Sequence, residues 1–61
     1  MAQGKVIAFS TAVSAGVIEG GNRRYYFYRD QWTSNDVEPA AGLRVQFEPD
    51  EATARKIKLV G

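Results

Sequence analysis

Four consecutive aromatic residues, Tyr25, Tyr26, Phe27 and Tyr28, are followed directly by Arg29. Aromatic rings stack on nucleic-acid bases, and a guanidinium group can both stack and contact phosphate. In an extended strand the side chains alternate between two faces, so Tyr25 and Phe27 would share one face and Tyr26 and Tyr28 the other. A hydrophobic core accounts for only one aromatic face. We therefore interpret Tyr26, Tyr28 and Arg29 as a candidate site for stacking and phosphate binding.

Each of these residues also has a purely structural interpretation. Tyrosine favours strands whatever the function, so Tyr26 and Tyr28 could simply pack against a neighbouring strand. Arg29 could be solvated or paired with a nearby carboxylate such as Asp30.

The composition argues against catalysis and against metal binding. The chain has no cysteine and no histidine, which removes thiolate ligands and the commonest general base. Its seven carboxylates show no spacing typical of calcium coordination or of a paired acid and base. We expect neither an enzyme nor a metal site or cofactor.

The size of the chain indicates one domain over residues 1–61. With a net charge of only +1, the protein would attract a polyanion through local placement of charge rather than through its overall field. The apolar stretch that follows Lys5 resembles part of a secretory signal, but it contains three hydroxyl residues and a glycine. No stretch approaches the length of a membrane span, so we expect a cytoplasmic protein with no membrane partner.

Short segments bounded by glycine and polar residues predict strands rather than long helices. We expect strands over residues 4–9, 15–19, 23–29 and 43–49, with a tight turn at Gly20 to Asn22. The final segment could form a helix capped by Asp50, but the alternation of Ile57 and Leu59 with lysines favours a strand.

Five short strands in so small a chain predict an all-β fold, closed or nearly closed into a barrel, because an open sheet would leave bare edges. Trp32 is expected to fill the barrel as a buried plug. Inward positions of the strands predict one shared core, formed by Phe9, Ile18, Phe27, Val45, Phe47 and Ile57. The pattern alone fits both an OB-fold and an SH3-like barrel.

The order of these segments resembles the cold-shock domain family. The family opens with Gly, Val and Phe at the spacing of Gly4, Val6 and Phe9, and a Gly-x-Ile motif is matched by Gly16 to Ile18. A second family motif, which displays aromatic rings, falls on residues 25–29. The resemblance implies a small five-stranded antiparallel OB-fold barrel that binds single-stranded RNA or DNA.

The binding face departs from the family pattern. Ala8, Ala15 and Val17 stand where the family has aromatic rings, and Ile7 and Val13 stand where it often has lysines. One stacked base contributes about 1–3 kcal/mol, so the loss of three rings costs at least about 3 kcal/mol, or about a hundredfold in affinity. Tyr26, Tyr28 and Arg29 keep the character of the second motif, so the resemblance implies weak binding that tolerates many sequences.

The same departures support an alternative. Small apolar side chains in place of rings and lysines would form an exposed apolar face, which often marks a contact with protein. The alternative function is a protein-interaction or homodimer module that kept the barrel and lost the nucleic acid. Its predicted contact face comprises Ile7, Val13, Ala15 and Val17, beside Ala8.

Overall fold

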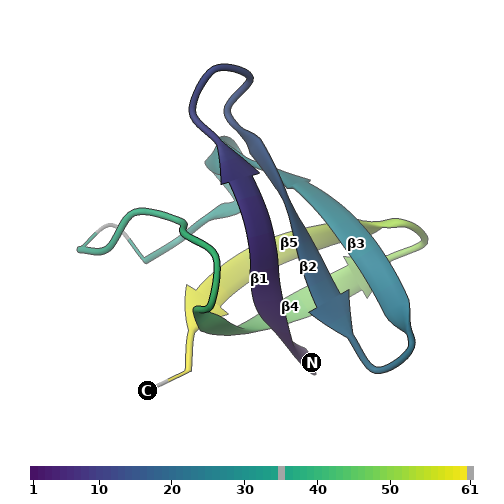
Figure 1. The fold of residues 1–61 in the computed structure, drawn as a ribbon. Helices are drawn as coiled ribbons and strands as arrows, with labels where there is room; N and C mark the ends of the chain where they lie inside the picture. Colours follow the sequence, from purple (N-terminus) through teal and green to yellow (C-terminus); the bar gives the residue numbers. More distant parts are fainter. Residues whose placement is uncertain (35, 61) are drawn as a thin grey trace.

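The computed structural model describes residues 1–34 and 36–60, and almost all of its regular structure is β-strand (Figure 1). Position 35, which falls between the predicted strands over residues 23–29 and 43–49, and position 61 lie outside the described residues. The elements in chain order are β1 (Ala2–Ser10), β2 (Ala15–Gly20), β3 (Arg23–Tyr28), the single-turn 3-10 helix η1 (Arg29–Gln31), β4 (Arg44–Asp50) and β5 (Thr53–Leu59).

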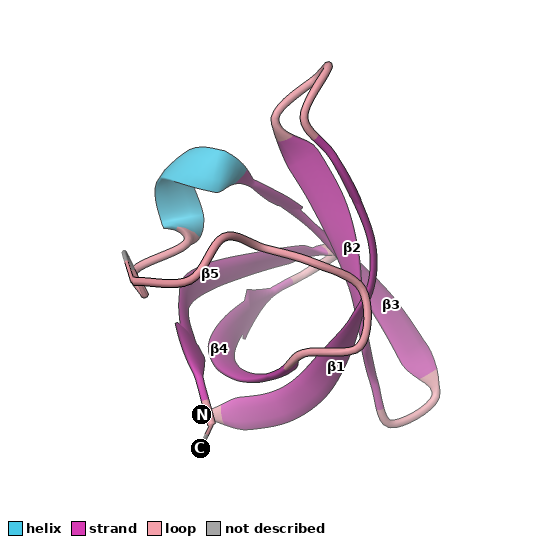
Figure 2. Cartoon of the chain, turned by 60° about the vertical axis from the view of Figure 1, so that its left-hand side comes forward, coloured by secondary structure: helices cyan, strands magenta, loops and turns pink. Residues whose placement is uncertain are grey.

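The strands close into a barrel in the order β1-β2-β3-β5-β4, with β4 returning to β1. Four neighbouring pairs are antiparallel, and the pair formed by β3 and β5 is parallel. Figure 2 shows the strands curving around a common interior, with η1 at the end of β3. This is an all-β barrel of the OB-fold type, as expected, and the parallel pair that completes it joins elements far apart in the chain.

Two local irregularities control which side chains face inward. In β1, Val6 is opposite Ile18 but Ala8 is opposite Val17, so Ile7 is an extra residue in the ladder. Such a bulge bends a strand and resets its alternation. As a result Val6 and Phe9, three positions apart, both reach the core.

A second bulge lies in β5, where Lys56 has a left-handed backbone with φ of 51°. It lets Ala54 and Ile57 both point inward, although they too are three positions apart. The predicted strand at the end of the chain is thus confirmed, and the alternative helix after Asp50 is wrong.

The predicted core is confirmed, with Phe9 half-buried and packed against it. Phe27 lies at its centre, since its ring stacks on Phe9 at 5.9 Å and on Trp32 at 6.2 Å between centroids. The indole Nε1 of Trp32 donates to the carbonyl oxygens of Ser34 and Val37 at 2.9 and 2.7 Å, which satisfies its one polar atom. The core also includes three residues outside the predicted list: Val6, Tyr25 and Ala54.

The turn between β2 and β3 forms as predicted. Gly20 pairs with Arg23, which leaves Gly21 and Asn22 as the loop, and Gly21 adopts a positive φ of 62°. The predicted third strand, however, is one residue too long, because Arg29 begins η1 instead of continuing β3.

Candidate functional site

The alternation of β2 and β3 divides their side chains between the core and the outer surface. Gly16 faces inward so closely that an added Cβ would lie 2.7 Å from Cζ of Phe27, and Ile18 is fully buried. Val17, which lies between them, therefore faces outward. We call the outer surface of β1 to β3 at this level the tyrosine face, which comprises Ala8, Ser10, Ala15, Val17, Tyr26 and Tyr28.

The two tyrosines of this face are exposed, at 60% for Tyr26 and 68% for Tyr28. In the described part of the chain, neither ring stacks on another aromatic ring and neither hydroxyl makes a hydrogen bond. Tyr25, by contrast, points inward and packs on Phe47 at 5.0 Å between centroids. The alternation predicted for the aromatic run is therefore correct, and the outward rings are accessible to a ligand.

Small neighbours leave the tyrosine rings uncovered. Val17 lies directly opposite Tyr26 across the β2–β3 ladder, and Ala15 lies opposite Tyr28. Side chains in such pairs touch when they are long enough, but alanine and valine reach little of an adjoining ring. A shallow hollow of about 300 Å³ extends from Tyr26 across Val17 to Ala8 and Ser10.

A second hollow, of about 220 Å³, lies on the other side of the same tyrosines. It forms where β3 and β5 diverge, since Tyr26 and Thr53 are the single residue pair of that ladder. Gln31 and Arg55 line it together with Tyr28. Tyr26 thus lines both hollows and Tyr28 lines the second, so a planar group can approach Tyr26 from either side.

The structure separates the four residues of the predicted protein-contact face. Ala15 and Val17 lie side by side on the tyrosine face. Ile7, 36% exposed, belongs to the β1 bulge, and Val13, 67% exposed, lies in the turn between β1 and β2. Neither Ile7 nor Val13 lines the apolar hollow, whose β1 wall is formed by Ala8, Phe9 and Ser10.

Arg29 is held at the edge of the site rather than on the strand. Its backbone N–H donates to the carbonyl of Ser14 at 2.8 Å, and its guanidinium pairs with Glu38 at 3.2 Å. The carboxylate partner is therefore Glu38 and not the neighbouring Asp30. To contact a phosphate, the Arg29 guanidinium would have to leave Glu38. An exposed ion pair of this kind contributes only about 0–1 kcal/mol to stability, so the exchange would cost little.

Two cations near this surface were not singled out by the sequence analysis. Lys5 of β1 and Arg44 of β4 are direct cross-strand partners, although they are 39 positions apart in the chain. A single sequence holds no signal for such a pairing, because it depends on how the barrel closes.

The described residues contain no group of three or more Asp, Glu, His or Cys side chains that could hold a metal ion. No helix among them is long and apolar enough to cross a membrane.

The sequence matches no protein-family model, and no curated protein is similar to it in sequence.

Proposed function

We propose that this protein is a weak, sequence-tolerant binding module for single-stranded RNA or DNA, and that bases stack on Tyr26 and Tyr28. The observation that carries the proposal is the pair of exposed rings, free of other aromatic contacts among the described residues, on the outer face of β3. OB-fold barrels bind oligonucleotides on the face of their second and third strands and with the adjoining loops. The resemblance of residues 4–18 and 25–29 to the cold-shock domain family supports the same ligand.

The chemistry of the face supports tolerance of sequence. Every base has a flat π-surface, so stacking on tyrosine selects little between bases. The cross-strand partners of the rings on β2, Val17 and Ala15, are aliphatic and offer no side-chain hydrogen bond to a base edge. Binding would therefore depend on stacking and on phosphate contacts, and it would weaken as salt is added.

A titration of a fluorescently labelled oligopyrimidine, followed by anisotropy at low and at moderate salt, tests this function. The parent should bind, and Tyr26→Ala with Tyr28→Ala should lose roughly 2–6 kcal/mol of binding free energy if both rings stack. Tyr26→Phe with Tyr28→Phe is the matched control, because it keeps the rings and removes only the hydroxyls. An alanine pair that binds as well as the parent would contradict the proposal.

The competing function is self-association of two copies through the tyrosine face. The apolar hollow beside Tyr26, walled by Val17 and Ala8, favours it. Val17→Lys would place a charge in a contact that must exclude water, so it should dissociate such a dimer without unfolding the barrel. Sedimentation of the parent over a wide concentration range decides, and a monomer at every concentration would exclude this alternative.

A further inference from the structure

A row of charged residues crosses four strands beside the tyrosine face. The residue pairing places Arg44 opposite Lys5, Lys5 opposite Glu19, and Glu19 opposite Arg24. We call these four residues the cation row, since three of them are cations and one is a carboxylate. It lies toward the β2–β3 turn, whereas the opposite end of the tyrosine face ends in the uncharged Ser10 and Ala15.

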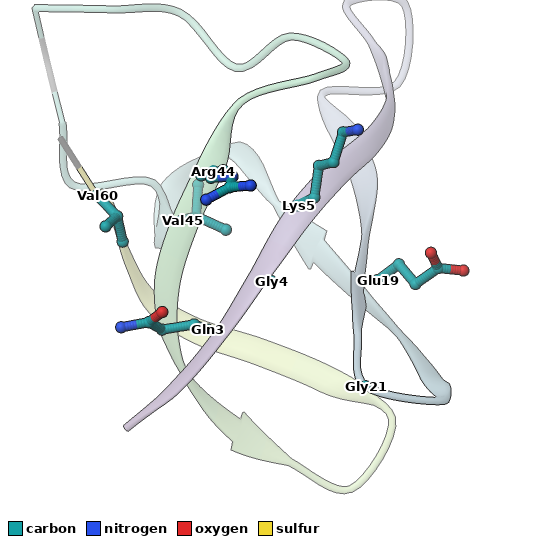
Figure 3. A pocket seen from close by; sticks show the side chains of 8 residues that line it. All are labelled: Gln3, Gly4, Lys5, Glu19, Gly21, Arg44, Val45 and Val60. Atoms are coloured by element: carbon teal, nitrogen blue, oxygen red, sulfur yellow. The ribbon is translucent and has the colours of Figure 1, made fainter.

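Two members of the row, Lys5 and Arg44, form no ion pair among the described residues. Glu19 pairs with Arg24 at 3.9 Å, and Figure 3 shows its carboxylate pointing away from Lys5. Like charges directly opposite each other destabilise a sheet, so the pair of Lys5 and Arg44 costs stability unless an anion lies between or above the two groups.

The space around the pair suits an anionic group. A hollow of about 300 Å³ lies over β1 and β4 and is lined by Lys5 and Arg44, and also by Glu19, whose carboxylate points away from Lys5. Figure 3 shows Arg44 extending toward the strand that carries Lys5. Gln3 adds an amide on the same stretch of β1. A guanidinium donates in a planar fork and an ammonium in several directions, and both geometries match phosphate oxygens.

The cation row is within reach of a chain bound to the tyrosines. Lys5 and Tyr26 project from the same outer surface, two strands and one side-chain row apart. With strands about 4.8 Å apart and a two-residue step of about 7 Å, that offset is about 12 Å. OB-fold sites span roughly 4–16 nucleotides, so one strand can cover both groups.

We infer that Lys5 and Arg44 bind backbone phosphates of the same single strand whose bases stack on Tyr26 and Tyr28. The strand then runs obliquely over the barrel, from the apolar tyrosine face toward the β2–β3 turn and β4. This inference rests on the proposed function, and it adds two phosphate-binding residues and the direction of the path.

The test compares the salt dependence of oligopyrimidine binding among single-charge variants. Lys5→Gln and Arg44→Gln should each lower by about 0.7 the steepness with which log affinity falls against log salt concentration. The factor by which each variant binds more weakly than the parent should therefore shrink about 2.6-fold between about 50 and 200 mM salt. Lys56→Gln is the control: Lys56 is exposed on β5 and pairs with Glu48 at 3.8 Å, four positions beyond Arg44 on β4. Its slope should stay that of the parent.

The possible results distinguish the phosphate path over Lys5 and Arg44 from the proposed function, which is single-strand binding at Tyr26 and Tyr28. If the parent binds and the Tyr26 and Tyr28 variants weaken that binding, but Lys5→Gln and Arg44→Gln leave the salt slope at that of the parent, the phosphate path is wrong and the function stands. If the parent does not bind the oligopyrimidine, both the proposed function and the phosphate path are wrong. Melting temperatures close to that of the parent are expected for both glutamine variants, since each changes an exposed side chain that forms no ion pair in the described residues, and they would exclude unfolding as the cause of weaker binding.

Discussion

Val17 and Tyr26 face each other across the β2–β3 ladder on the outer surface of the barrel, while their neighbours Ile18 and Phe27 are buried beneath them. The aliphatic side chain leaves the tyrosine ring exposed at 60% and forms one wall of the apolar hollow beside it. This pairing separates the residues that hold the fold from those available to a ligand, and each group predicts a different response to substitution.

The two faces of β3 should differ sharply in their contribution to stability. Phe27→Ala removes a ring that is 2% exposed and stacks on both Phe9 and Trp32, so it should cost about 3–5 kcal/mol of unfolding free energy. Tyr26→Ala with Tyr28→Ala removes exposed rings and should cost far less. Urea unfolding of both variants checks this, and equal losses would refute the assignment of the two faces.

Gly16 should tolerate no side chain. A Cβ there would lie 2.6 Å from the carbonyl oxygen of Ala8 and 2.7 Å from Cζ of Phe27, both inside van der Waals contact. We expect Gly16→Ala to destabilise the barrel by about 1–3 kcal/mol, as overpacking of a core does. Gly21→Asn is the control, because nothing lies within 4 Å of the position that an added Cβ would take and asparagine tolerates a positive φ. Thermal melts that rank the two variants in the opposite order would contradict the packing described for β2.

Val17→Phe should strengthen binding. The new ring would stand beside Tyr26 over the apolar hollow and could stack one further base, worth about 1–3 kcal/mol. Val37→Phe is the control, since Val37 is 39% exposed and lies on the loop between η1 and β4. Calorimetry or anisotropy with an oligopyrimidine measures the difference. Affinity that rises equally in both variants would indicate nonspecific adhesion.

Releasing Arg29 from Glu38 should also raise affinity. Glu38→Gln removes the carboxylate that holds the guanidinium at 3.2 Å, which frees it for phosphate and should steepen the salt slope by about 0.7. Asp36→Asn removes the same charge from the same loop, and Asp36 forms no ion pair in the described residues. If both changes alter the slope equally, Arg29 has no role in binding.

The features that depend on the local pattern of residues could be predicted from the sequence. The alternation of Tyr25 to Tyr28, the turn at Gly21 and the burial of Trp32 follow from periodicity and residue type, and the structure confirms all three. Both bulges escaped prediction, because an extra residue at Ile7 or near Lys56 breaks the period of two on which the alternation rule depends. The burial of Val6 and Ala54 was missed for that reason.

Contacts between segments far apart in the sequence could not be predicted from its local pattern. Arg29 meets Glu38 only because the loop after η1 folds back, and Lys5 meets Arg44 only because β4 closes the barrel against β1. Residue types predicted that Arg29 would contact a phosphate, be solvated, or pair with a nearby carboxylate such as Asp30. They did not predict which carboxylate, nor that two cations would face each other with no anion between them.

The most direct test of the central proposal is chemical-shift mapping of the labelled protein with a short unstructured oligopyrimidine, at low salt and high protein concentration. Nucleic-acid binding by the tyrosine face predicts shifts of the Tyr26 and Tyr28 ring and backbone signals, together with those of Val17 and Ala15 beside them. Shifts confined to other surfaces, or no shift at any accessible concentration, would contradict nucleic-acid binding by the tyrosine face.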